Sequence, residues 1–276
     1  MRILVRGVLV GLVCGAGALV TAGAQVTRYV RYRAADRISY GILEGTRIRE
    51  LSGDLFRSPQ PTGRTIPLSQ ATLLAPCEPG KVIAVGLNYK SHLGDRPVAA
   101  YPGLFAKLPS SIIGPEANII YPPDAENLHY EGELVVVIGR RASNVSAADA
   151  ARYVFGVTAG NDVSERNWQR NDLQWFRAKA SDSFGPLGPA IVTGLNYHDL
   201  LLQTRLNGEV VQSERTKDLL FDVPTIVSYV SRYVTLEPGD VIYTGTPGTT
   251  RPIKPGDVVE VELEGVGVLR NRVAKP

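Results

Sequence analysis

An unbroken apolar run from Leu134 to Ile138 places the strongest constraint on how this chain folds. Strands that face water on one side alternate apolar and polar residues, whereas a continuous run is typical of a strand covered on both faces. Glu131 and Glu133 precede this run, and side chains two residues apart on a strand lie on the same face, about 6.8 Å from each other. Two carboxylates at the mouth of a buried strand repel each other, so their burial is costly unless a metal cation or a Lys/Arg side chain neutralises them.

Further strands are expected along the rest of the chain. A Pro-Gly turn followed by a charged residue and a β-branched run occurs at residues 79–83, 238–242 and 255–259. Each occurrence predicts a tight turn that leads into a strand. The C-terminal segment 258–273 is expected to form two strands around Glu264-Gly265.

The remaining segments indicate a mainly β (α+β) fold with few short helices. Short alternating runs from Val26 to Leu51 predict a small antiparallel β unit, and Ser52 to Pro79, rich in Pro, Gly, Ser and Thr, is interpreted as a linker. Helices are expected over Ser146 to Tyr153 and over Pro224 to Tyr233. The sequence therefore favours a mixed sheet that is rolled or sandwiched.

The first residues have the pattern of a secretory signal. Arg2 and Arg6 precede the mostly apolar run Gly7 to Val20, and Ala22-x-Ala24 supplies the small residues of a cleavage site. The pattern predicts export, to the periplasm or outside the cell, with cleavage after Ala24. The alternative is an uncleaved membrane anchor, although the run is shorter than the roughly 20 residues of a membrane span.

These features divide the chain into a signal peptide at 1–24, a small N-terminal β domain with its linker at 25–75, and a larger domain at 76–276. Cleavage would leave Cys77 as the only cysteine, which excludes an intramolecular disulfide. The net charge of +3 and the lack of a Lys/Arg-rich run argue against nucleic acid as a partner.

A second segment strengthens the prediction of a metal. An apolar strand over Val154 to Val157 ends in a bend of small residues, and Asp162 follows that bend. Glu131 and Glu133 alone are more typical of a solvated strand end, but Asp162 completes a set of three carboxylates without cysteine. Such oxygen donors suit Mg²⁺ or Mn²⁺, or Ca²⁺ in a crystal, rather than zinc.

Five motifs in order, from about Val82 to Val273, resemble the fumarylacetoacetate hydrolase family. They are Gly86-Leu87-Asn88-Tyr89-x-x-His92, His129-Tyr130-Glu131-x-Glu133-Leu134, Asn161-Asp162-Val163-Ser164-x-Arg166, Lys179-x-x-Asp182-x-Phe184-x-Pro186-Leu187-Gly188-Pro189 and Thr244-Gly245-Thr246-Pro247-Gly248. The resemblance implies a mixed β-sandwich roll, a homodimer, and a catalytic role for the larger domain. It also implies metal ligands at Glu131, Glu133 and Asp162.

His92 and Asp95 are the expected proton-handling pair. Residues three apart lie on the same face of a helical turn, and a carboxylate that holds one imidazole nitrogen makes the other a general base. In the resembling family this segment is a lid, and the acid is usually Glu where this chain has Asp95. From the residues alone, a structural role for His92 is the alternative.

Lys179 and Arg166 supply the expected positive charge. Lys179 could neutralise the third carboxylate or stabilise negative charge that develops on the substrate, and its alternative is a surface lysine. Arg166 could bind a substrate carboxylate through two hydrogen bonds or form a structural ion pair.

Three further residues are expected to line the substrate pocket. Thr246 follows Gly245 at a strand end, where glycine lets the backbone approach a ligand. Phe105 and Lys107 match a pocket segment of the resembling family. His129 is expected to support the metal ligands through hydrogen bonds.

The sequence therefore predicts a divalent-metal-dependent hydrolase that cleaves a C–C bond of a small acylpyruvate or 1,3-diketo acid through a metal-stabilised enolate. One alternative is a metal-dependent isomerase, tautomerase, hydratase or decarboxylase of a keto acid such as oxaloacetate, because the fold does not choose among these. Another is an exported protein that binds a keto acid or metal without catalysis. A working pair of His92 and Asp95 favours hydrolysis or decarboxylation, and a failed pair favours simple proton transfer.

Overall fold

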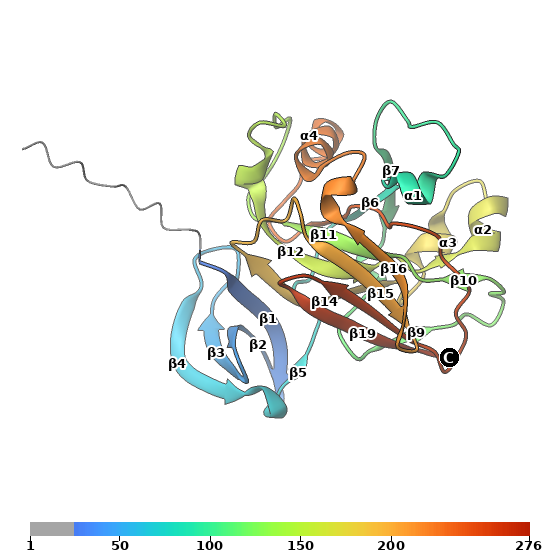
Figure 1. The fold of residues 1–276 in the computed structure, drawn as a ribbon. Coiled ribbons are helices and arrows are strands. Elements are labelled where there is room, and N and C mark those ends of the chain that lie inside the picture. The colour runs from blue at the N-terminus through green and yellow to red at the C-terminus, as the bar shows by residue number, and fades with distance from the viewer. Residues whose placement is uncertain (1–24) are drawn as a thin grey trace, which may run out of the picture.

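The protein folds into two packed β-sheets with short helices around them (Figure 1). The computed structural model describes residues 25–276, so the predicted signal peptide at 1–24 lies outside the described residues. Within residues 25–276 the chain forms nineteen strands and four α-helices. The predicted mainly β fold with few short helices is confirmed.

The larger sheet has twelve strands and carries the predicted metal ligands. From edge to edge its path is β4 (Gln60–Pro67), β3 (Arg47–Ser52), β2 (Arg37–Glu44), β1 (Thr27–Ala34), β14 (Gly185–Thr193), β12 (Val154–Asn161), β11 (Gly132–Ile138), β17 (Val241–Tyr243), β6 (Val82–Gly86) and β7 (Gly103–Lys107), while β5 (Thr72–Leu73) pairs with β1 and β8 (Ile112–Ile113) with β14. Strands β1 to β4 therefore extend the main sheet at one edge, where they stand out in blue and cyan in Figure 1.

The second sheet has five strands and packs against the first. In order they are β16 (Glu209–Arg215), β15 (Leu201–Leu206), β18 (Val258–Leu263), β19 (Gly267–Ala274) and β9 (Asn118–Ile120), and a separate two-stranded ladder joins β10 (Leu128–His129) to β13 (Ser164–Glu165). The three predicted Pro-Gly turns do lead into strands, namely β6, β17 and β18.

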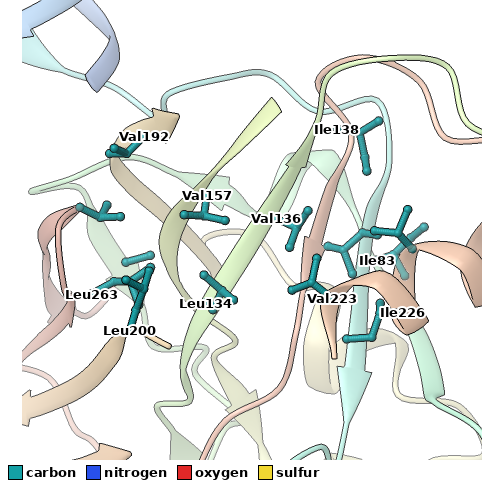
Figure 2. Close-up of a cluster of buried hydrophobic side chains, with 14 of the residues drawn as sticks. Ile83, Leu134, Val136, Ile138, Val157, Val192, Leu200, Val223, Ile226 and Leu263 are labelled. Carbon is teal, nitrogen blue, oxygen red and sulfur yellow. The ribbon is translucent and has the colours of Figure 1, made fainter. Parts of the chain in front are cut away.

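Strand β11 is buried along its whole length, as the apolar run predicts. Leu134, Val136 and Ile138 pack into the cluster drawn in Figure 2, which also holds residues of β15 and β18 from the second sheet. Val135 and Val137 point the other way, into a separate cluster. Because side chains alternate along a strand, Glu133 lies on the face of Val135 and Val137.

The helices are short and lie at the edges of the sheets. They are α1 (Lys90–Leu93), α2 (Arg166–Asn171), α3 (Phe176–Ala180) and α4 (Val223–Tyr233). The predicted helix over 224–233 is confirmed as α4, which begins where the Asp222 carboxylate accepts the Thr225 N–H at 2.9 Å.

Two local predictions are wrong. The segment interpreted as a linker, 52–79, contains β4 and β5, because β3 offers a free edge with which residues 60–67 pair. The helix expected over Ser146 to Tyr153 is only a 3₁₀ turn over Ala150–Tyr153. Ser146 does cap Asp149, but β12 begins at Val154 and leaves no length for a further turn.

Candidate active site and metal centre

Strands β11 and β12 bring the three predicted metal ligands together. They pair antiparallel with Gly132 opposite Asn161, so Asp162 lies beside Glu131 and donates its N–H to the Glu131 carbonyl at 2.8 Å. One carboxylate oxygen from each of Glu131, Glu133 and Asp162 lies within 4.8 Å of the other two. The three carboxylates are therefore assembled at one end of β11.

Two buried lysines lie against these carboxylates. Lys179 Nζ is 2.7 Å from Glu131 Oε2 and 2.5 Å from Asp162 Oδ2, and Lys107 Nζ is 2.6 Å from Asp162 Oδ1. Burial lowers the pKa of Lys107, whereas for Lys179 the attraction of Asp162 and Glu131 outweighs burial and raises the pKa. Lys179 thus neutralises carboxylates, and Lys107 lies behind the ligands instead of lining the pocket.

Glu133 is the carboxylate that has no ion-pair partner among the described residues. Its Oε2 accepts the Gly245 N–H at 2.7 Å, and among residues 25–276 no lysine, arginine or histidine forms an ion pair with it. Burial and the charges of Asp162 and Glu131 raise the pKa of Glu133 well above its ordinary range. Three buried carboxylates, one of them without a cation, fit a hard divalent ion that takes oxygen ligands. These three residues can hold a divalent metal ion.

Arg166 forms the structural ion pair that was one of its two expected roles. Its Nη2 lies 2.5 Å from Glu131 Oε1 and 2.9 Å from Thr250 Oγ1. Burial alone would raise the pKa of Glu131, but Lys179, Arg166 and His92 outweigh it and hold the pKa well below its ordinary range. The carboxylate is therefore ionised and ready to bind a metal.

His129 is linked to Glu131 through Thr250 and Arg166. Its Nδ1 lies 2.8 Å from Thr250 Oγ1, which also contacts Arg166, and its Nε2 lies 2.9 Å from Asn127 Oδ1. Burial, together with the nearby Arg166 charge, lowers the pKa of His129 to about 4. The ring is therefore neutral and supports the site through hydrogen bonds.

His92 faces the site, but Asp95 does not join it. His92 Nε2 is 3.6 Å from Glu131 Oε1, and Nδ1 is 2.6 Å from the carbonyl oxygen of Gly248. Helix α1 ends before Gly94, whose φ of 64° turns the chain away from helical geometry. Asp95 is exposed, and the described residues show no hydrogen bond or ion pair between it and His92. The prediction that one helical turn carries both His92 and Asp95 is therefore wrong.

A cavity of about 550 Å³ lies beside the carboxylates. Its walls include the predicted residues His92, Phe105, Glu131, Glu133, Lys179 and Thr246. The Phe105 ring centre lies 4.9 Å from Lys179 Nζ. The Thr246 hydroxyl is already used inside the protein, since it donates to the Gly132 carbonyl at 2.8 Å and accepts from Gln212 at 2.9 Å.

Three other wall residues, Arg96, Arg170 and Trp175, were not predicted. Arg96 and Trp175 lie in irregular segments, and their approach to the cavity depends on contacts between distant parts of the chain. Arg170 did carry a signal that could have been used. It follows Arg166 by four residues, and within α2 this spacing places both on one helix face.

Comparison with known proteins identifies the family. The model of the fumarylacetoacetate (FAA) hydrolase C-terminal domain matches residues 81–274. The chain belongs to the fumarylacetoacetate hydrolase family. A second model, Rv2993c-like N-terminal, matches residues 27–76.

Relatives in this family align with most of the chain. Protein Rv2993c of Mycobacterium tuberculosis is 42% identical over 261 residues, which cover 90% of this chain and 98% of that protein. Oxaloacetate tautomerase FAHD2A, mitochondrial, of Bos taurus is 44% identical over 223 residues, 75% of this chain and 71% of that protein. The crystal structure of 2-hydroxyhepta-2,4-diene-1,7-dioate isomerase from Mycobacterium marinum matches with a TM-score of 0.85 at 42% identity, covering 90% of this chain and 98% of that one. The predicted family and fold type are confirmed.

The predicted export is wrong. The bovine relative, which aligns with 75% of this chain, is named a mitochondrial enzyme. Basic residues near the N-terminus also occur in transit peptides, so Arg2 and Arg6 before an apolar run do not determine the compartment. Among the described residues, no helix is long and apolar enough to cross a membrane.

Proposed function

We propose that this fumarylacetoacetate hydrolase family enzyme interconverts the keto and enol forms of a small 2-keto dicarboxylic acid, with a divalent cation as cofactor. The observation that carries the proposal is the surroundings of His92, whose ring is held by a backbone carbonyl and not by a carboxylate. A hydrolase that activates water with a histidine–carboxylate pair needs the carboxylate at the ring. Asp95 is not there, and the carboxylate that does approach the ring, Glu131 at 3.6 Å, belongs to the candidate metal ligands. A His92 without Asp95 favours simple proton transfer.

The contact with Gly248 fixes the tautomer of His92. A carbonyl oxygen only accepts hydrogen bonds, so Nδ1 carries the proton and donates it to Gly248. In the neutral ring Nε2 then has a free lone pair on the side of Glu131, 3.6 Å away. This nitrogen borders the cavity, where it can take a proton from a substrate carbon and return it to oxygen.

The expected reaction is a balanced proton shift. Glu131, Glu133 and Asp162 would hold a divalent cation, which would act as a Lewis acid and stabilise the negative charge of the enolate. His92 removes a proton from the carbon next to the keto group, the C–H electron pair becomes the C=C bond, and the carbonyl π electrons move to oxygen, which receives the proton from His92. No carbon–carbon bond breaks and no water is consumed. Lys179 balances the negative charge of Glu131 and Asp162, because its ammonium group donates to both.

Two arginines at the cavity favour a substrate with a second carboxylate. Arg96 donates to the backbone carbonyls of Leu93 and His92, and Arg170 donates to the Asn167 side chain. All these acceptors are neutral, and within residues 25–276 neither arginine forms an ion pair. Their charges therefore attract an anionic substrate into the cavity. The bovine relative is named an oxaloacetate tautomerase, and oxaloacetate is a small dicarboxylate, which supports this substrate class.

The proposal is tested with oxaloacetate and Mg²⁺. Ultraviolet absorbance follows the enol form, and NMR follows pyruvate release and the cleavage of a panel of acylpyruvates. We expect the protein to accelerate tautomer exchange, and His92→Asn to lower kcat about 100-fold or more, the contribution of a general base. Asp95→Asn should stay within a few-fold of the unmodified protein.

Other outcomes would select the alternatives. If an acylpyruvate is cleaved faster than tautomers exchange, and His92→Asn and Asp95→Asn lose that cleavage equally, the protein is the C–C hydrolase that the sequence predicted. Binding of oxaloacetate without exchange, decarboxylation or cleavage would support a non-catalytic binding protein.

A further inference from the structure

The second sheet approaches the backbone of the metal strand closely at Gly132, between the ligands Glu131 and Glu133. A Cβ atom added to Gly132 would overlap the hydroxyl of Thr204 on β15. This glycine therefore lets β15 approach the backbone that joins the two ligands.

Side chains from outside β11 bind both backbone polar groups of Gly132. Its N–H donates to Gln212 Oε1 at 3.1 Å, and its carbonyl accepts the Thr246 hydroxyl at 2.8 Å. Gln212 Nε2 in turn donates to Thr246 Oγ1 at 2.9 Å and to the Pro247 carbonyl at 2.6 Å. Gln212 is 4% exposed and Thr246 is 3% exposed, so water does not compete for these hydrogen bonds.

Gln212 holds the loop of residues 245–248, and this loop also contacts the site at both of its ends. At one end, the Gly245 N–H donates to Glu133 Oε2 at 2.7 Å. At the other end, the Gly248 carbonyl accepts from His92 Nδ1 at 2.6 Å. A shift of residues 245–248 would therefore move a metal ligand and the proposed base together.

We infer that Gln212 is a positioning residue, which fixes Gly132 and the loop 245–248 in register and so sets the geometry of Glu131, Glu133 and His92. Gln212 lies on β16, the edge strand of the second sheet. It does not line the cavity itself and reaches the wall only through Thr246. Groups that orient metal ligands from outside commonly account for about a 10- to 100-fold difference in metal affinity. The inference rests on the metal site of the proposed function.

Gln212→Met tests this role, since it keeps the length of the side chain and removes its hydrogen bonds. Asn271→Leu is the matched control, because the buried Asn271 amide donates to the carbonyls of Gly114 and Ala117 and does not reach the site. Mn²⁺ affinity is measured by EPR of the free ion, with thermal unfolding of the metal-free proteins beside it. We expect both variants to lose thermal stability, and only Gln212→Met to weaken Mn²⁺ binding, by about tenfold or more.

Thr246→Val removes the same link from the other side, and it keeps the test valid if Gln212→Met does not fold. It should weaken Mn²⁺ binding by a similar factor, and the double variant should be no weaker than either single one, because both act through Gly132. An unchanged Mn²⁺ affinity in Gln212→Met or Thr246→Val would overturn the positioning role, as would losses that add in the double variant. If the unmodified protein itself fails to bind Mn²⁺, the metal site of the proposed function falls as well, so the two failures are distinguishable.

Discussion

The N-terminal strands and the centre of the same sheet both bury carboxylates, but they surround them differently. Glu50 on β3 accepts hydrogen bonds from the Tyr32 hydroxyl at 3.1 Å, the Arg37 guanidinium at 2.6 Å and the Thr62 hydroxyl at 3.1 Å. These donors come from β1, β2 and β4. Burial alone would raise the pKa of Glu50, but the hydrogen bonds outweigh it and lower the pKa.

At the end of β11 three carboxylates occupy one space, and Glu133 has a single backbone donor. Its pKa moves the opposite way to that of Glu50, upward, because burial acts together with like charges. A buried carboxylate surrounded by donors is stable without further partners, whereas one placed against two others needs a cation. The first arrangement stabilises the fold, and the second suits a metal site.

Glu133→Gln is expected to have the largest effect. It should weaken Mn²⁺ binding more than 100-fold, beyond the roughly 10- to 100-fold cost of losing a supporting hydrogen bond, and abolish turnover. The metal-free variant should be more stable than the unmodified protein, since the repulsion with Asp162 and Glu131 is reduced. EPR of free Mn²⁺ and urea unfolding in EDTA measure the two effects. Unchanged Mn²⁺ affinity would remove Glu133 from the ligand set.

Saturation with metal is expected to have the second-largest effect, an increase in the free energy of unfolding. At a free Mn²⁺ concentration 100 times the Kd, linkage predicts about 2.7 kcal/mol of added unfolding free energy. Urea unfolding with and without EDTA measures it. Glu133→Gln should show no such gain, and Glu50→Gln should keep all of it. A gain that survives in Glu133→Gln would mean that the ion binds elsewhere.

The metal side of the cavity was predictable from sequence because strand geometry is regular. The run Leu134 to Ile138 required a buried strand, and alternation placed Glu131 and Glu133 on one face. Asp162 followed the next strand, and antiparallel pairing of β11 with β12 brought it back to the same end. Local patterns and one antiparallel pairing thus indicate the three carboxylates, and the resemblance to the family was needed to predict them as a ligand set.

The rest of the site depends on contacts that no local pattern reveals. Asp95 lies three residues after His92, as a helical pair requires, but Gly94 ends the helix and separates them. Lys107 reaches Asp162 from the edge strand β7, 55 residues earlier in the chain. Gln212 reaches Gly132 from another sheet. Each contact follows from how the sheets pack, which the sequence does not display.

Glu50→Gln should cost stability without affecting metal binding. The substitution removes the negative charge toward which three donors point. We expect the free energy of unfolding, measured in urea near neutral pH, to fall by about 1–3 kcal/mol. The pKa of folded Glu50 lies below its ordinary value of 4.5, so its contribution is present above that pH and is lost as the pH falls through the folded pKa. Glu50→Gln should therefore lack this part of the loss of stability that acid causes in the unmodified protein. Weaker Mn²⁺ binding in Glu50→Gln would contradict the separation of the two regions.

Arg37→Gln should have the smallest effect. The Arg37 side chain is 57% exposed, so its pair with Glu50 is screened by water and salt and is worth about 0–1 kcal/mol. Tyr32 and Thr62 still donate to Glu50, but the pKa of the carboxyl should rise toward its ordinary value, so that stability begins to fall at a higher pH than in the unmodified protein. Urea unfolding near neutral pH and at about pH 4, each at low and high salt, measures both effects. If Arg37→Gln costs as much as Glu50→Gln, then Glu50 depends on a single cation in the way that the carboxylates at β11 do, and the contrast between the two regions fails.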